Sequence, residues 1–215
     1  MRKCWLIISS ILLAANLMAQ SANEALLANE ITWYGIDYSH VKLIGEFSQF
    51  GEAGVKSESE IRDKYFPAWN ELVLKEASKY NIKSAFRKDE VIYDLDVVNL
   101  RNSRVNPGHL IAFDNEQNNL DEDAIQAIVS EYPASSEKGY GLVFIAKSLD
   151  KRREVGSYHV VLFDKASRKV VFNRVLAGKA AGFGIRNYWA RSYYDVIEQS
   201  KANYKKWLKE STAKN

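Results

Sequence analysis

Residues 141–177, GLVFIAKSLDKRREVGSYHVVLFDKASRKVVFNRVLA, decide the fold class that the sequence predicts. Three apolar runs, at 141–147, 155–163 and 169–177, are separated by short, charged turns. Antiparallel hairpins are the simplest way to connect such runs, because a tight turn reverses the chain between them. The stretch therefore predicts three consecutive antiparallel strands.

Upstream of this stretch, two further segments have the composition of strands. Residues 31–44 are rich in β-branched and aromatic side chains and predict one or two strands, with Gly35 at a bulge or a close backbone contact. Residues 91–100 alternate between apolar and polar side chains, which is the period of a half-buried strand. On that predicted strand Asp94 and Asp96 share one face.

Helices are predicted between and after the strands. Residues 57–80 predict a helix, because Ser57 begins a capping-box pattern and apolar residues recur at helical spacing; Pro67 kinks or restarts it. Residues 121–131 predict a short helix with acidic residues in its first turn. An aromatic stripe at helical spacing predicts a long helix over 186–210.

The predicted order of elements is β-α-β-α-β-β-β-α. With the three hairpin strands in its second half, this order predicts an α+β fold: a single, mostly antiparallel sheet of four to five strands with helices packed on one face. Residues 30–215 are expected to form one domain that ends in the long C-terminal helix, and residues 20–29 are a polar lead-in to it.

Residues 1–19 have the pattern of a cleaved export signal. Arg2 and Lys3 are followed by a short apolar run and by a small residue, Ala19, at the position where signal peptidase cuts. That run is too short to span a bilayer, and no later apolar segment is long enough. The only cysteine, Cys4, lies in this leader, so the mature chain is expected to be cysteine-free and without disulfides.

The net charge argues against one class of partner, and the leader indicates where the protein is located. The formal charge of +3 over 215 residues falls by two when Arg2 and Lys3 are removed, and this balance does not indicate nucleic-acid binding. The leader resembles the signal peptides of exported proteins from the Bacteroidetes. That resemblance implies an envelope protein in the periplasm or at the cell surface of a Gram-negative bacterium.

The hairpin at residues 160–171, VVLFDKASRKVV, resembles the strand, Asp-x-x-Ser/Thr turn and strand of small envelope domains. Examples of such domains are the periplasmic domain of the curli secretion channel and the related penicillin-binding-protein activator lipoproteins. The resemblance implies an assembly or interaction module without catalysis.

A glycine-rich turn and the start of the last helix form the predicted binding site. Arginine and aromatic side chains together are typical of interaction hot spots, and free amides at a helix start favour an anion. The aromatic residues are also compatible with packing in the core, and the sequence leaves that alternative open. The predicted binding residues are Gly182, Gly184, Arg186, Tyr188, Trp189 and Arg191.

Three residues are candidates for acid–base chemistry: His109, beside a turn in a long polar connection, and the pair Asp94 and Asp96. The sequence has no His-Glu-x-x-His pattern and no phosphate-binding glycine motif, so it predicts no metal and no cofactor. It favours a non-catalytic, exported binding or assembly module whose partner is an envelope protein or glycan. The alternatives are an envelope hydrolase that acts on glycan or peptide and a small-anion-binding protein, and the oligomeric state stays open.

Overall fold

The computed structural model describes residues 22–47, 57–112 and 119–212. The predicted leader, residues 1–19, lies outside them. Residues 22–27, in the predicted lead-in, form a short helix, and Leu26 of this helix is buried in the core. This part of the lead-in therefore belongs to the folded domain.

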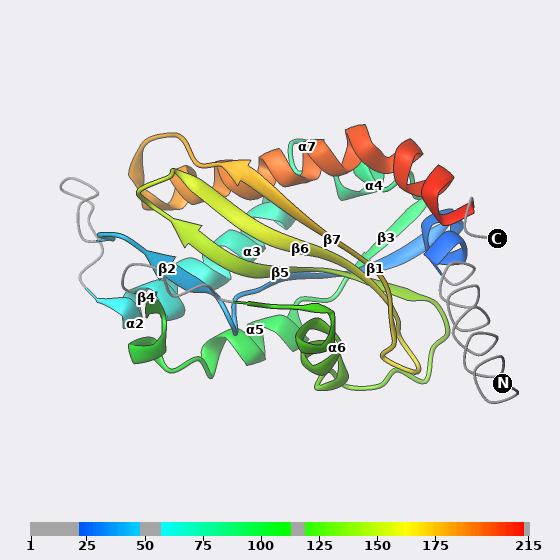
Figure 1. Ribbon diagram of the computed structural model, residues 1–215, viewed down its shortest axis with the longest axis horizontal. Coiled ribbons are helices and arrows are strands. Elements are labelled where there is room, and N and C mark those ends of the chain that lie inside the picture. The colour runs from blue at the N-terminus through cyan, green and yellow to red at the C-terminus, as the bar shows by residue number, and fades with distance from the viewer. Residues whose placement is uncertain (1–21, 48–56, 113–118, 213–215) are drawn as a thin grey trace, which may run out of the picture.

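The three consecutive strands predicted from residues 141–177 are present as β5 (Tyr140–Asp150), β6 (Val155–Asp164) and β7 (Val170–Lys179) (Figure 1). They pair antiparallel in sequence order along almost their whole length. The prediction of antiparallel hairpins in this stretch is confirmed.

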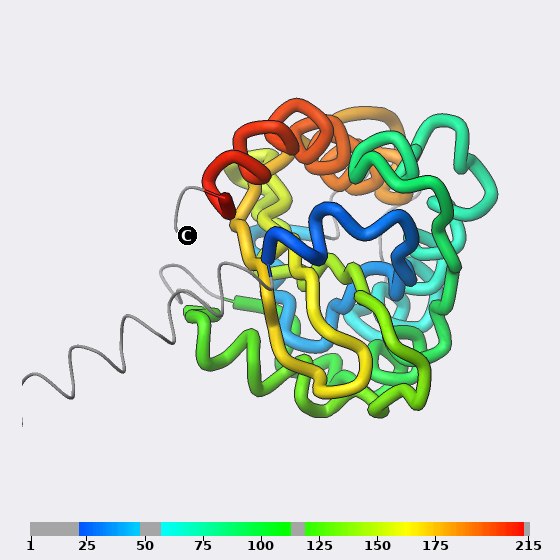
Figure 2. Tube along the Cα trace, turned by 90° about the vertical axis from the view of Figure 1, so that its right-hand side faces the viewer, coloured from blue at the N-terminus to red at the C-terminus, as the bar shows by residue number. Residues whose placement is uncertain are grey.

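The other edge of β5 pairs with two strands that run parallel to it. β1 (Glu30–Asp37) lies beside the first half of β5, and β2 (Lys42–Ile44) lies beside its last three residues. β3 (Glu90–Tyr93) then pairs with β1, and β4 (Ile111–Ala112) pairs with β2, again in parallel. The sheet of the described residues has seven strands, five of them parallel in the order β3-β1-β5-β2-β4, and it curls into a half-barrel (Figure 2).

The predicted fold class, an α+β fold on one mostly antiparallel sheet of four to five strands, is wrong. Residues 38–139 separate β1 from β5, and long connections that contain helices allow strands to pair in parallel. A hairpin turn is a local signal that a sequence displays. Nothing local in the sequence indicates that β1 and β2 pair with β5.

Helices cover both faces of the sheet, whereas the sequence predicted one covered face. α3 (Phe66–Lys75) and α7 (Gly184–Thr212) supply side chains to the core on one face. α5 (Asp96–Ser103) and α6 (Glu122–Ser130) supply side chains to the core on the other face (Figure 1). The predicted short helix and the predicted long last helix are confirmed as α6 and α7.

Two hydrophobic cores result, one on each face of the sheet. In β6, Tyr158 and Leu162 face the core under α7, whereas Val161 and Phe163 face the core under α6. Strands that are covered on both faces have nearly continuous apolar sequences, which explains the uninterrupted runs in β5 and β6. The largest fully buried side chains of the first core include Trp33, Phe66, Trp69, Phe144, Trp189 and Tyr193.

The predicted helix over 57–80 is present as three consecutive pieces that end at Lys75, so the prediction is wrong for residues 76–80. Ser57 caps its start as predicted, because its side chain accepts a hydrogen bond from the Glu60 amide, and Pro67 lies in the first turn of α3. The pieces before α3 are α2 (Glu58–Glu60) and the π-helix η2 (Ile61–Tyr65). Two further short helices lie later in the chain: α4 (Ile82–Ala85) and the 3-10 helix η3 (Pro107–His109).

The predicted strand over 91–100 is wrong beyond Tyr93. The side chain of Asp94 accepts a hydrogen bond from the amide of Asp96 at 3.2 Å, and α5 begins at that turn. Asp94 and Asp96 therefore do not share a strand face. Gly35, by contrast, lies at a bulge in β1 as predicted, with a φ of 98° that favours glycine.

Candidate functional site

The structure does not bring the three candidate acid–base residues together. Asp94 follows β3, and its amide donates to the carbonyl of Trp33, which pairs with Leu142 of β5. His109 lies in η3, and its carbonyl accepts a hydrogen bond from the side chain of Lys42 at 2.9 Å. Lys42 pairs with Ser148 of β5, about 20 Å along the strand from Leu142 at about 3.3 Å per residue. One acid–base site cannot contain residues held so far apart.

The predicted binding residues lie in the turn between β7 and α7 and in the first turns of α7. Gly182 and Gly184 have positive φ angles of 117° and 74°, so both positions favour glycine. The backbone of this turn is fastened to the turn between β5 and β6, because the Ala180 amide donates to the Glu154 carbonyl at 2.7 Å. The two turns therefore lie at the same end of the molecule (Figure 1).

The predicted aromatic contacts, Tyr188 and Trp189, are core residues. Trp189 is fully buried and stacks on Phe47 with ring centroids 5.4 Å apart, and Tyr188 is also buried. Burial, reinforced by the neighbouring Glu154 carboxylate, raises the pKa of Tyr188 to about 12. Both residues therefore pack in the core, which is the alternative that the sequence left open. Neither side chain is exposed enough to form a contact surface for a partner.

Phe183 is the aromatic residue that sequence reasoning missed. It lies between Gly182 and Gly184, and 92% of its surface is exposed. The next most exposed large apolar side chains of the described residues, Leu27 and Val175, reach only 56% and 55%. An aromatic residue between two glycines in a turn was the available signal, because such a turn has no side chains nearby to cover the ring.

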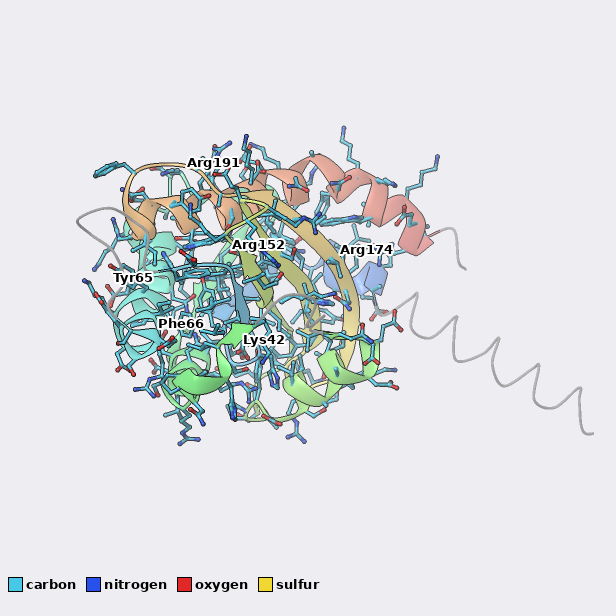
Figure 3. The ribbon with its side chains drawn as sticks, turned by 60° about the vertical axis from the view of Figure 1, so that its left-hand side comes forward. Lys42, Tyr65, Phe66, Arg152, Arg174 and Arg191 are labelled. Carbon is cyan, nitrogen blue, oxygen red and sulfur yellow. The ribbon has the colours of Figure 1, made fainter. Side chains whose placement is uncertain are left out.

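Six cationic side chains lie at the same end of the molecule as Phe183. The β5–β6 turn contributes three of them, and the end of β7 and the start of α7 contribute the other three. Figure 3 labels Arg152 on the β5–β6 turn and Arg191 on α7. We call Phe183 and these cations the basic aromatic end; its members are Phe183, Lys151, Arg152, Arg153, Lys179, Arg186 and Arg191.

Two carboxylates at this end, Asp150 and Asp195, accept hydrogen bonds from the backbone, and Asp150 also lies 4.0 Å from Arg152 Nε. Asp150 accepts hydrogen bonds from the amides of Arg152 and Arg153, at 3.0 and 3.1 Å. Asp195 accepts one from the amide of Lys179 at 3.1 Å and lies 3.9 Å from the Arg191 guanidinium. Among the described residues, no carboxylate forms an ion pair with the side chains of Arg153, Lys179 or Arg186. The described residues of this end include six cations and the carboxylates of Asp150, Glu154 and Asp195, so positive charge is in excess among them.

A second polar cluster, which the sequence did not indicate, lies where β1 ends. Asp37 is completely buried. One of its oxygens accepts from the amide of Ser39 at 2.8 Å, and the other accepts from Arg101 Nε at 3.0 Å and from the Tyr132 hydroxyl at 2.8 Å. We call these residues, with Glu131, the Asp37 cluster.

Arg101 connects the Asp37 cluster to the surface. Its guanidinium also donates to Glu131 at 2.6 Å and to the Ser39 hydroxyl at 3.1 Å, and it lies 5.2 Å from the centroid of the Tyr132 ring. Burial opposes the charge on Arg101, but Asp37 and Glu131 outweigh it and raise the pKa of the guanidinium. Burial and Asp37 raise the pKa of Tyr132, so its hydroxyl stays a donor.

The chemistry of the Asp37 cluster is structural. Three donors occupy three of the roughly four acceptor sites of the Asp37 carboxylate, and these contacts join β1 to α5 and to the residues after α6. The described residues contain no group of three or more His, Cys, Asp or Glu side chains that could hold a metal ion. They also contain no helix with the length and hydrophobicity to cross a bilayer.

We compared the chain with protein-family models, with curated proteins and with solved structures, and none of them matches it.

Proposed function

We propose that this chain is an exported, non-catalytic binding module whose contact surface is the basic aromatic end. The observation that carries the proposal is the 92% exposure of Phe183 beside Arg153, Lys179 and Arg186, whose side chains form no ion pair within the described residues. Export rests on the sequence of residues 1–19.

The energetics of Phe183 support a role in contact. Burying a phenylalanine side chain is worth about 1.5–3 kcal/mol, and this fold obtains nothing from Phe183 because its ring touches water. Isolated exposed apolar residues are common on proteins, but this one stands among arginines and lysines on a turn held in place by backbone hydrogen bonds. Aromatic and arginine side chains are the residues that dominate binding surfaces.

The geometry of the acidic and histidine residues supports the non-catalytic part of the proposal. His109 is separated from Asp94 and Asp96 along the sheet, and Asp37 is buried and accepts three hydrogen bonds from structural partners. His159 is buried in β6, and its Nδ1 forms a hydrogen bond with Asn173 Oδ1 at 3.0 Å. Burial lowers the pKa of His159. No two of these groups form an acid–base pair.

Photo-cross-linking in the cells that produce the protein tests the proposal. A photoreactive phenylalanine analogue replaces Phe183 in one strain and Leu100 in the control strain, because Leu100 is 53% exposed on α5. We expect irradiation to give an adduct from position 183, identified by mass spectrometry as protein, glycan or lipid, and none from position 100. Equal adducts from both positions, or none from position 183, would refute the proposal.

A further inference from the structure

We propose that the basic aromatic end docks on an anionic lipid bilayer, with Phe183 entering the interface and the surrounding cations resting on the headgroups. This inference deepens the proposed function and rests on it. It names the class of partner, which the proposed function leaves open.

The isolation of Phe183 favours a bilayer over a folded partner. Its chain neighbours Gly182 and Gly184 carry no side chains, and the aromatic residues that follow in α7, Tyr188 and Trp189, are turned into the core. A protein hot spot needs a ring of neighbouring contacts that excludes water from the central residue. A bilayer interface is deformable, so it can receive a single projecting ring without a matching pocket.

The charges around Phe183 fit an anionic surface. Lys179 precedes the turn, Arg186 follows it, and Arg153 extends from the adjoining β5–β6 turn. Arginine and lysine stems are long enough to keep their charges at headgroup level while the ring lies deeper. The neighbouring carboxylates Asp150 and Asp195 accept from backbone amides and pair with Arg152 and Arg191, at 4.0 and 3.9 Å, rather than with these three cations.

The two turns hold the charges and the ring in one unit. The Ala180 amide donates to the Glu154 carbonyl, and the Lys151 ammonium lies 4.2 Å from the centroid of the Tyr188 ring. Docking therefore requires little ordering of the backbone, so the entropic cost of binding is small.

Flotation with lipid vesicles tests the inference. The exported protein is purified after processing, and its mass shows whether residues 1–19 have been removed. Two vesicle types are used: phosphatidylcholine alone, and phosphatidylcholine with about one-third phosphatidylglycerol. The variants are Phe183→Ala, Arg153→Gln and Lys179→Gln, and the matched controls are Leu100→Ala and Lys201→Gln, which change an exposed apolar residue and an exposed cation elsewhere. Thermal unfolding establishes that each variant is folded.

We expect the parent protein to bind the anionic vesicles, to bind neutral vesicles at least about tenfold more weakly, and to be released by salt. Arg153→Gln and Lys179→Gln should each weaken binding about fivefold, because a cation near an anionic surface contributes that factor. Phe183→Ala should weaken it about tenfold. The two control variants should bind as the parent does.

Two results overturn the inference: equal binding of the parent to both vesicle types, or unchanged binding by Phe183→Ala. A protein adduct at position 183 together with no vesicle binding overturns the lipid assignment and leaves the proposed function standing. The absence of a specific adduct at position 183 overturns the proposed function itself.

Discussion

Asp37 shows what a fully buried carboxylate requires from its neighbours. Removing an ionised group from water costs several kcal/mol, and only close donors and an opposite charge offset that cost. The Ser39 amide, the Tyr132 hydroxyl and Arg101 supply both. The result is a connection between the end of β1, α5 and the end of α6.

Replacing Arg101 should expose the dependence of Asp37 on its partner. Arg101→Met leaves a buried carboxylate without its counter-charge, and we expect a loss of about 3–5 kcal/mol in the free energy of unfolding. Urea unfolding measures this loss. Glu131→Gln is the control: its carboxylate side chain is 64% exposed, so it should cost less than about 1 kcal/mol. Equal urea midpoints for the two variants would contradict the assigned role.

Lys88 is a buried lysine whose ammonium is held by backbone carbonyls. It donates to the carbonyls of Ala25, Leu26 and Ala28 at 3.0, 2.6 and 2.8 Å, and it is 4% exposed. These carbonyls lie at the end of the helix over residues 22–27, where a positive charge is favourable. Burial nevertheless lowers the pKa of Lys88 from 10.5 to about 8.

The lowered pKa of Lys88 predicts a stability that rises with pH. Between pH 8 and 10.5 the unfolded chain holds the proton that the folded protein has lost, so the free energy of unfolding increases with pH, by up to about 1.4 kcal/mol per pH unit. Urea unfolding from about pH 7.5 to about pH 8.5 measures the slope below the range in which tyrosines of the unfolded chain titrate. In Lys88→Met the free energy of unfolding should no longer increase over this pH range. An identical slope in this variant would show that another group causes the pH dependence.

At the scale of elements, α7 packs on β7 and β6 at very short range. Gly156 and Gly178 face Ser192 of α7, and the Ser192 hydroxyl lies 2.7 Å from the Tyr158 hydroxyl. α7 also caps two backbone groups at the end of β7: Gln199 donates to the Ala177 carbonyl at 2.8 Å, and Asp195 accepts from the Lys179 amide at 3.1 Å. An edge strand with capped backbone groups is protected from pairing with another chain.

The close approach of α7 and β7 predicts different costs for alanine at two glycines. In Gly178→Ala the new Cβ would come within 1.9 Å of the Ser192 carbonyl oxygen, so helix and strand must separate, at a cost of about 3 kcal/mol or more. In Gly184→Ala the new Cβ meets no atom within 4 Å, and only the positive φ costs about 1 kcal/mol. Thermal unfolding compares the two. If Gly184→Ala proved the more destabilising, the packing of α7 on β7 would be wrong.

At the scale of the whole molecule, β5 is the strand on which the fold depends. It pairs with β6 on one edge and with both β1 and β2 on the other. The run from Leu142 to Ala146 is fully buried, and its lack of polar alternation was the one sign in the sequence of a sheet covered on both faces. The hairpin turns that follow β5 favoured an antiparallel interpretation instead.

Only the features of the candidate site that are local in the chain could be predicted from the sequence. The glycine-rich turn before α7 and the charges of Arg186 and Arg191 are visible in the sequence. Which aromatic side chain is exposed is not visible, because Tyr188 and Trp189 are covered by residues from distant segments, such as Phe47. The Asp37 cluster was invisible for the same reason, since its members come from three separate elements.

The sequence by itself determined the elements whose causes are local: the three hairpin strands of residues 141–177, the cap at Ser57, the bulge at Gly35 and the long last helix. Turn chemistry, capping and hydrophobic periodicity act between residues close in the chain. The tertiary structure alone decided that β5 takes β1 and β2 as parallel partners, that helices cover both faces, and that Phe183 is exposed. Those outcomes depend on contacts between residues far apart in the chain, and no single segment contains the information for them.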